Sequence, residues 1–305
     1  MAWFETLDNK ITDYLPDLKY VRDEPMHKHL SFRVGGRAKR MAFPKNAEQV
    51  VLLMSFASAC GARPLIIGNG TNLLVPDEGL DRLVVNMAGE FAAVGMLGEC
   101  ELTATAGVSL TRLALFAFEH SLTGLEFAHG IPGTLGGAVC MNAGAYGGEM
   151  KDVITSVTLL DPARGIVTLK ADEMQFSYRR SMLSDHPEYV VLSATFRLQR
   201  GDKDAINAKM RELMEKRRAS QPLEYPSAGS TFKRPTGYYA GTLIEDCGLK
   251  GCRVGGAEVS QKHAGFIINV GNATCQDVLT LIEKVQKTVY DAHGVMLEPE
   301  VRLVR

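Results

Sequence analysis

The sequence has no run of about 18 uncharged apolar residues, the length that a membrane-spanning helix requires. It also has no excess of either charge, since 34 lysines and arginines stand against 35 aspartates and glutamates. This balance argues against a dedicated nucleic-acid-binding protein, which usually carries a strong basic excess. Glu5 and Asp8 precede any apolar run, so the N-terminus does not resemble a signal peptide. We therefore expect a globular cytoplasmic protein that binds neither membrane nor nucleic acid.

Several signatures of metal and nucleophile chemistry are missing as well. The only close cysteine pair, Cys247 and Cys252, has no histidine at a zinc-finger spacing after it, and the six cysteines are typical of free thiols in a reducing cytosol. The seven histidines form no HExxH pattern, and Ser230 is not in a GxSxG elbow. No GxxxxGK[ST] loop occurs. These absences argue against a metal centre, a serine hydrolase and a P-loop NTPase.

The hydrophobic pattern predicts an α+β chain that changes character near residue 200. Asn46 and Gln49 form a capping-box pattern for a helix that ends at Gly61 with Pro64. Further helices are predicted at 109–120, 203–218 and 274–294, and short apolar or alternating runs predict strands at 31–43, 64–67, 72–75, 82–106, 153–160, 165–170, 189–198, 265–270 and 296–304. The stretch 220–256 is predicted to be mostly loop.

Glycine is abundant, at 30 of 305 residues, and two clusters stand out. The first contains Gly68, Asn69, Gly70, Thr71 and Asn72; the second contains Gly130, Ile131, Pro132, Gly133, Thr134, Gly136 and Gly137 and continues into Asn142, Ala143 and Gly144. Glycines allow positive φ, so successive N–H groups can point into one concavity that binds an anion. Neither cluster is a Rossmann fingerprint, because the first lacks a third glycine and precedes a strand. Together they favour a phosphate-bearing ligand, although each alone is also compatible with a tight turn.

Three side chains outside the clusters are candidates for chemistry. Arg179 lies in FSYRRS, Ser230 in YPSAGSTFKRP and Glu300 in LEPEVR. Lys233 and Arg234 add positive charge near the serine. Taken alone, the three residues are equally compatible with a surface arginine, a turn serine and a solvated glutamate.

Six segments in one order nevertheless resemble the UDP-N-acetylenolpyruvoylglucosamine reductase (MurB) family, over roughly residues 30–304. They are GNGTNLLV, GLEFAHGIPGTLGGAVCMNAGAYGGE, the YRxS segment at 178–181, PSAGSTFKRP, GGAEVSQKHAGFIIN and LEPEVR. The interval between Ser181 and Ala219 leaves no room for the tyrosine-bearing lid of the longer form. The chain therefore resembles the shorter, type II form of the family.

The resemblance implies an FAD-binding module of the vanillyl-alcohol-oxidase (PCMH) type, made of two α+β subdomains. These would be residues 1–80, joined by the terminal strand 295–305, and residues 81–200. Residues 201–294 would form a C-terminal α+β substrate-binding domain. Both glycine clusters, through Gly144, would hold non-covalent FAD.

The resemblance also implies the reaction, a UDP-N-acetylmuramate dehydrogenase activity of bacterial peptidoglycan synthesis. NADPH would reduce FAD, and the flavin would pass hydride to C3 of UDP-N-acetylglucosamine enolpyruvate. Arg179 would stabilise the resulting charge, Glu300 would hydrogen-bond the developing aci-carboxylate, and Ser230 would protonate C2, with Lys233 a candidate to assist it. Tyr178, Lys233 and Arg234 are expected to contact substrate. The protein is expected to be a monomer without a metal.

Two other functions stay open at this stage. One is a different FAD-dependent oxidase or dehydrogenase on the same module, with flavin tethered through His129 or Cys140 as a variant. The other is a non-catalytic flavin-binding redox sensor, which would bind ligand but consume no NADPH in response to a UDP-sugar.

Overall fold

The computed structural model describes residues 2–304, which form two compact units assembled from segments distant in sequence. Unit 1 consists of Met1–Val21, Arg40–Asn69 and Arg82–Lys216, and unit 2 of Arg22–Lys39, Gly70–Asp81 and Arg217–Arg305. Within residues 2–304, every helix is too short or too polar to cross a membrane. The two units do not test the three-part division expected from the sequence, which stays a prediction.

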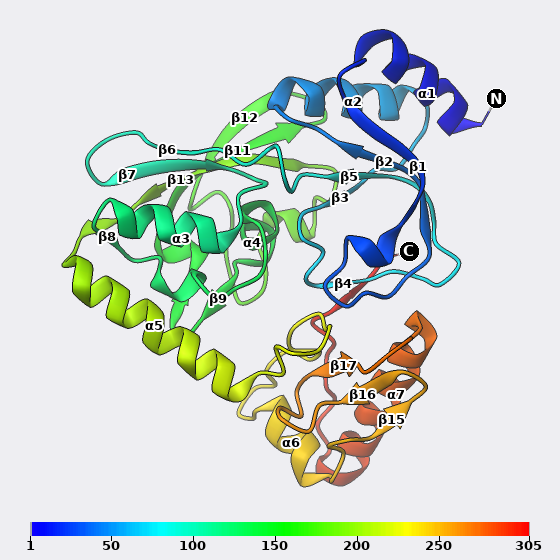
Figure 1. Ribbon diagram of the computed structural model, residues 1–305, viewed down its shortest axis with the longest axis vertical. Helices are drawn as coiled ribbons and strands as arrows, with labels where there is room; N and C mark the ends of the chain where they lie inside the picture. The colour runs from blue at the N-terminus through cyan, green and yellow to red at the C-terminus, as the bar shows by residue number, and fades with distance from the viewer. Residues whose placement is uncertain (1, 305) are drawn as a thin grey trace. The chain divides into compact units, whose positions relative to one another are not determined.

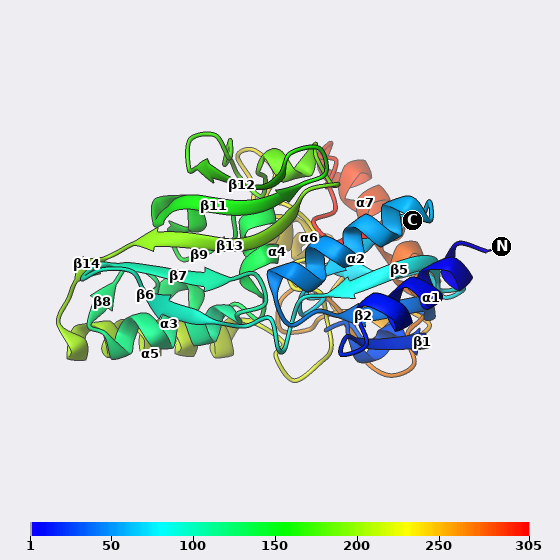
Figure 2. The same ribbon diagram turned by 90° about the horizontal axis from the view of Figure 1, so that it is seen from above.

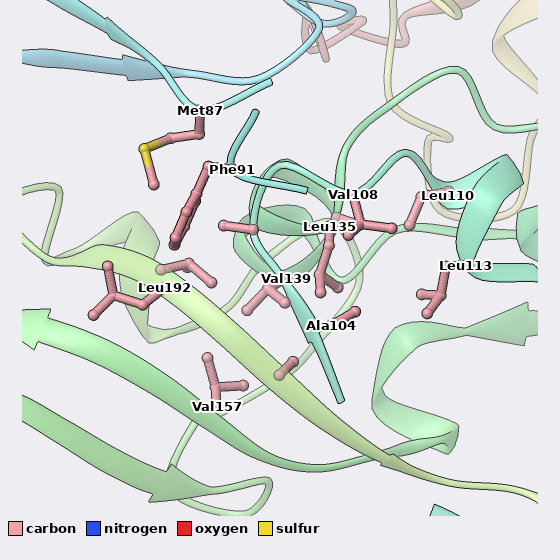
Figure 3. Close-up of a cluster of buried hydrophobic side chains, with 14 of the residues drawn as sticks. Met87, Phe91, Ala104, Val108, Leu110, Leu113, Leu135, Val139, Val157 and Leu192 are labelled. Carbon is pink, nitrogen blue, oxygen red and sulfur yellow. The ribbon is translucent and has the colours of Figure 1, made fainter. Parts of the chain in front are cut away.

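The main sheet of unit 1 has five antiparallel strands in the order β12-β11-β13-β7-β6 (Figure 2). The strands are β6 (Val94–Met96), β7 (Glu101–Thr105), β11 (Ile154–Asp161), β12 (Gly165–Lys170) and β13 (Val190–Arg197). Helix α4 (Leu135–Met141) contacts β13 and β7. Figure 3 shows Leu135 and Val139 of this helix gathered with Val157 and Leu192 of the sheet. The second glycine cluster thereby runs into a helix that is fixed on the sheet.

A second sheet, with the order β1-β2-β5-β3, is associated with two helices (Figure 1). Its strands are β1 (Lys19–Pro25), β2 (Arg37–Phe43), β3 (Leu65–Ile67) and β5 (Leu80–Asn86), and α1 (Trp3–Tyr14) contacts α2 (Ala47–Ala59). The Asn46 side chain accepts a hydrogen bond from Gln49 N at the start of α2, as the capping pattern predicts. Strand β3 ends at Ile67, immediately before Gly68, so the sheet positions the first glycine cluster.

The rest of unit 1 consists of short strands and two further helices. They are α3 (Leu110–Glu119), α5 (Lys203–Ser220), which runs on into unit 2, and the strand pairs β8 (Leu122–Thr123) with β14 (Gln199–Arg200) and β9 (Gly144–Ala145) with β10 (Gly148–Glu149). Ile206, Met210 and Leu213 on α5 are buried, as its amphipathic pattern predicts.

Unit 2 contains a three-stranded sheet and two helices around one hydrophobic cluster (Figure 1). The elements are β15 (Arg253–Val254), β16 (Ala257–Val259), β17 (Ile267–Asn269), α6 (Ala240–Asp246) and α7 (Cys275–His293). Thr274 and Asp277 form a capping box at the start of α7, and Gly294 ends the helix with a φ of 68°. Strand β18 (Arg302–Leu303) pairs in parallel with β4 (Leu73–Leu74).

Most predicted elements are confirmed, and the exceptions have local causes. Helix α4 was missed because two glycines lower its helix propensity. Helix α6 lies inside the stretch that was predicted to be loop. The sequence feature that could have indicated the end of this helix is Gly248, which has a φ of 68° just after it. The terminal strand is shorter than predicted and covers only Arg302 and Leu303.

Candidate active site

The two glycine clusters contact each other within unit 1. A Cβ atom at Gly68 would lie 1.9 Å from Thr134 Oγ1, so a larger residue at this position would push the segments apart. The Asn69 side chain donates from Nδ2 to Pro132 O over 2.8 Å. Segments more than 60 residues apart are thus held together, which the sequence pattern alone could not show.

The surroundings of α4 fit a ligand that approaches the backbone closely. Gly137, in the first turn of the helix, has open space where a side chain would begin. Next to the cluster, the buried Nδ1 of His129 has no hydrogen-bond partner among residues 2–304, and burial lowers the pKa of this imidazole. The N–H groups of Leu135 and Gly136 donate to Val108 O and Ala106 O. These two donors therefore hold the helix in place and do not face a ligand.

The remaining part of the first cluster belongs to unit 2 and contacts the C-terminal segment. Gly70 has a φ of 59°, and its carbonyl accepts from Ser31 N over 3.2 Å. Asn72 Nδ2 donates to Glu300 O over 3.0 Å, and Asn72 O accepts from Arg302 N over 3.0 Å. The main chain of Glu300 is therefore fixed by a residue of the glycine cluster.

Ser230 and Glu300 lie on neighbouring segments of unit 2. Glu300 N donates to Thr231 O and Lys233 N donates to Glu298 O, each over 2.8 Å, so residues 231–233 run antiparallel to 298–300. The Ser230 side chain is exposed, and that of Glu300 is partly exposed. The structure thus brings the predicted serine and glutamate segments together.

The basic residues after Ser230 have partners of their own. The Lys233 ammonium forms an ion pair with Glu298, and the Arg234 guanidinium lies over the Tyr239 ring, 4.0 Å from its centroid. The ion pair neutralises Lys233, which weakens the expectation that Lys233 assists Ser230.

Arg179 lies in a tight turn. Ser177 N donates to Arg180 O over 3.0 Å and Arg180 N to Ser177 O over 3.2 Å, which defines the four-residue turn Ser177–Arg180, here called the arginine turn. Arg179 has a φ of 55°, a conformation that residues other than glycine rarely adopt. Its guanidinium lies 5.0 Å from the centroid of the Tyr178 ring. Arg180 points to a different partner, Asp185, at 2.5 Å.

Glu149 is a neighbouring carboxylate that the sequence did not single out. Hydrogen bonding to Lys151 is the main cause of its lowered pKa, and Asn142 and the charge of Arg179 lower the pKa further. Glu149 lies on β10. No spacing of residues in the sequence connects it with the arginine turn, and only the structure shows that the two are close. Among residues 2–304, no three histidine, cysteine, aspartate or glutamate side chains are placed to bind a metal ion.

Comparison with known proteins assigns both halves of the chain. Residues 38–170 match an FAD binding domain, and residues 221–304 match the C-terminal domain of UDP-N-acetylenolpyruvoylglucosamine reductase. A UDP-N-acetylenolpyruvoylglucosamine reductase of Caldanaerobacter subterraneus subsp. tengcongensis is 49% identical over 300 residues, 98% of each chain. The chain belongs to the UDP-N-acetylenolpyruvoylglucosamine reductase family. A second such reductase, from Agathobacter rectalis, is 48% identical over 311 residues, again 98% of each chain.

A solved structure agrees with membership of the UDP-N-acetylenolpyruvoylglucosamine reductase family. The crystal structure of MurB from Thermus caldophilus superposes with a TM-score of 0.81 at 35% identity, covering 94% of this chain and 99% of that one. The predicted fold class, a PCMH-type FAD-binding module followed by a C-terminal α+β domain, is confirmed, and the protein is an FAD-dependent oxidoreductase. The FAD match includes both glycine clusters, and the C-terminal match includes Ser230 and Glu300. Arg179 lies between the two matches.

Proposed function

We propose that the protein reduces UDP-N-acetylglucosamine enolpyruvate to UDP-N-acetylmuramate, with NADPH as reductant, in peptidoglycan precursor synthesis. Membership of the reductase family and the FAD binding domain support this proposal. The observation that carries it is the pairing of residues 231–233 with 298–300, in which Glu300 N donates to the carbonyl of Thr231, the residue after Ser230. A hydrolase or a simple binding module has no need for this serine and glutamate together with an FAD domain.

Non-covalent FAD would be held by the two glycine clusters, with Gly68, Asn69 and the segment Gly130–Gly137 in unit 1. When bound, FAD supplies the hydride that C3 of the enolpyruvyl group receives. The close contact of Gly68 with Thr134 and the open space at Gly137 suit a cofactor that lies against backbone. Asn142, Ala143 and Gly144 were expected to extend this contact.

Arg179 would stabilise the negative charge that develops when C3 of the substrate becomes saturated. This charge arises at C2 and is shared with the adjoining carboxylate. A guanidinium presents several N–H donors in a fixed plane and stays protonated, so it suits a planar carboxylate. Tyr178 would orient the guanidinium through the stacking contact between the two side chains.

Ser230 and Glu300 would complete the reaction. Ser230 would donate its hydroxyl proton to C2 and recover a proton from solvent, while Glu300 would hydrogen-bond the developing acid. The hydrogen bond from Asn72 to Glu300 O fixes the glutamate backbone for this role. Lys233 and Arg234 would contact the anionic parts of the UDP-sugar.

The serine assignment is tested with Ser230→Ala. We expect turnover to fall by about two or more orders of magnitude, the usual contribution of a positioned acid, while anaerobic reduction of FAD by NADPH keeps its rate. Stopped-flow absorbance separates the two half-reactions. The control is Ser58→Ala, which removes an exposed serine of α2. Near-normal product formation by Ser230→Ala would show that another group protonates C2.

The remaining expectations belong to the same proposal. The protein would work as a cytoplasmic monomer on a small-molecule UDP-sugar. Its two FAD-binding subdomains would be residues 1–80 and 81–200, with residues 201–294 binding substrate.

A further inference from the structure

The side chain of Asn142 is fully buried and has its hydrogen bonds satisfied by protein atoms. Nδ2 donates to Glu149 Oε2 and to Ser177 O, each over 3.0 Å, and Oδ1 accepts from Lys151 N over 2.9 Å. A primary amide has only two N–H groups, so both donors are used. A role as a direct FAD ligand, expected from the sequence, would require one of these bonds to break. The contact with Ser177 points instead to the arginine turn.

A second hydrogen bond ties the other side of the same turn to the same helix. Ser181, which is 1% exposed, donates from Oγ to Cys140 O over 2.9 Å. Ser177 and Ser181 flank the turn, and their partners, Asn142 and Cys140, lie at the C-terminal end of α4. The turn is therefore attached to this helix end on both sides.

The conformation of Arg179 explains why such attachment matters. A non-glycine residue with positive φ is strained and persists only where the surroundings hold it. The cation–π contact with Tyr178 depends on this conformation, because both side chains belong to the turn. Loss of the two bonds would remove the side-chain hydrogen bonds that attach the turn to the end of α4 and would allow the guanidinium to move.

We propose that Asn142 and Ser181 are positioning residues that fix Arg179 relative to the cofactor segment through α4. The helix begins at Leu135, inside the second glycine cluster, and has seven residues, so it spans about 10 Å from that cluster to the end that holds the arginine turn. One rigid element thus sets the distance between the FAD-binding backbone and the charge-stabilising arginine. This inference rests on the proposed role of Arg179.

Two variants remove the two hydrogen bonds separately: Asn142→Gly removes the bond to Ser177 O, and Ser181→Ala removes the bond to Cys140 O. Asn142→Gly suits the backbone, because Asn142 has a φ of 43° and glycine is favoured at this position after a helix. Ser181→Ala removes one hydroxyl and keeps the rest of the side chain, so it tests the proposal if Asn142→Gly does not fold. Asn272→Gly is a matched control, since Asn272 has a φ of 53° and is exposed in unit 2.

The first readout is independent of activity. Trypsin cleaves after arginine, and the turn contains Arg179 and Arg180. In both variants we expect cleavage in the turn to be on the order of tenfold faster than in the unchanged protein and in Asn272→Gly, because local opening exposes the peptide bonds. Equal cleavage rates would overturn the proposal, since the two hydrogen bonds would not be holding the turn.

The second readout uses stopped-flow absorbance to measure the two half-reactions separately. Reoxidation of the NADPH-reduced enzyme by the enolpyruvyl substrate should slow by about 10- to 100-fold, the effect of a small misplacement of a catalytic group. FAD affinity and the rate of reduction by NADPH should stay unchanged. A rise in the Kd for FAD, with a normal reoxidation rate at saturating FAD, would instead make Asn142 a cofactor ligand and contradict the proposal.

A double variant separates this inference from the proposed function. If Asn142 acts through Arg179, adding Asn142→Gly to Arg179→Lys should slow reoxidation by much less than the product of the two single effects. Multiplicative effects would overturn the positioning role. If Arg179→Lys alone has no effect, the proposed function of Arg179 fails, and the trypsin result still decides whether the ties hold the turn.

Discussion

Arg179 and Arg180 are neighbours in sequence but differ in backbone conformation and in partner. Arg179 adopts a positive φ and lies against the Tyr178 ring, while Arg180 is exposed and forms an ion pair with Asp185. The two arginines lie in a turn that is closed by the hydrogen bonds between Ser177 and Arg180. The turn, and not the alternation of a strand, therefore sets the different directions of their side chains. The pair therefore offers a matched comparison within one segment.

We expect Arg179→Lys to lower kcat strongly and Arg180→Lys to have little effect. Lysine keeps the charge at position 179 but loses the planar fork, and loss of one donor to a developing charge costs about 10²–10³ in kcat. At position 180, an exposed ion pair contributes little. Steady-state kinetics on both variants check this. The opposite pattern would transfer the catalytic role to Arg180.

At the scale of single residues, the sequence indicated the candidate residues better than it indicated the contacts that they make. The glycines, asparagines and threonines of the two clusters were recognisable because small and polar residues favour such turns. The Asn142–Ser177 bond joins residues 35 positions apart, and no periodicity encodes a contact across that separation. Hence the bond from Asn142 to the arginine turn, the carboxylate of Glu149 and the interactions of Ser181 were missed.

Among the elements, α1 is held to the second sheet by a buried polar group. Arg40 on β2 donates from Nε and Nη2 to the two carboxylate oxygens of Asp8 over 2.7 Å each, and Tyr20 on β1 donates to Asp8 over 2.8 Å. Burial, followed by the Asp8 carboxylate, raises the pKa of Tyr20, so the hydroxyl stays protonated and continues to donate. Asp8 thus completes a small network of buried hydrogen bonds.

We expect Asp8→Ala to lower the free energy of unfolding by about 3–5 kcal/mol, because it removes the carboxylate that forms an ion pair with the buried Arg40 guanidinium. Urea unfolding followed by circular dichroism measures this change. Asp13→Ala, which removes an exposed aspartate of the same helix, should stay within about 0.5 kcal/mol. Similar effects of the two substitutions would mean that the Asp8 network contributes little.

The turn between β11 and β12 predicts an acid-sensitive contribution to stability. Arg164, with help from the N–H groups of Ala163 and Arg164, lowers the pKa of Asp161 to about 2. A lowered folded-state pKa stabilises the protein above the unfolded-state pKa, and this contribution is lost as pH falls from about 4 to about 2. Asp161→Asn should therefore reduce the urea midpoint at pH 6 and make no difference near pH 2. A constant difference across this range would contradict the assignment.

The element pattern was largely predictable because caps and periodicity are local signals. Asn46, Thr274 and Gly294 mark helix ends through hydrogen bonds or conformations that involve only adjacent residues. Short strands such as β15 and β18 have two residues each, too few to show a period of two. Strand β15 pairs locally with β16 across Gly255 and Gly256, whereas β18 pairs with the distant strand β4, so the bounds of β18 could not be derived from the sequence.

On the scale of the whole molecule, chain order and spatial grouping differ. Residues 22–39 and 70–81 belong to unit 2 with the C-terminal third, whereas composition suggested one change near residue 200. Parallel pairing of β18 with β4 holds the 70–81 segment in that unit, as do the hydrogen bonds that Cys275 N and Gln276 N donate to the Asp77 carboxylate. Such pairings span about 200 residues, and only the family resemblance indicated that the C-terminal strand returns.

The proposed function requires one FAD-containing protein to accept electrons from NADPH and to pass them to the enolpyruvyl sugar. It is tested most directly by an anaerobic absorbance titration of the purified protein. We expect the visible flavin bands to bleach on addition of NADPH and to return, without oxygen, when UDP-N-acetylglucosamine enolpyruvate is added. Return only on admission of oxygen would indicate an oxidase, and a colourless protein that takes up no added FAD would contradict the account.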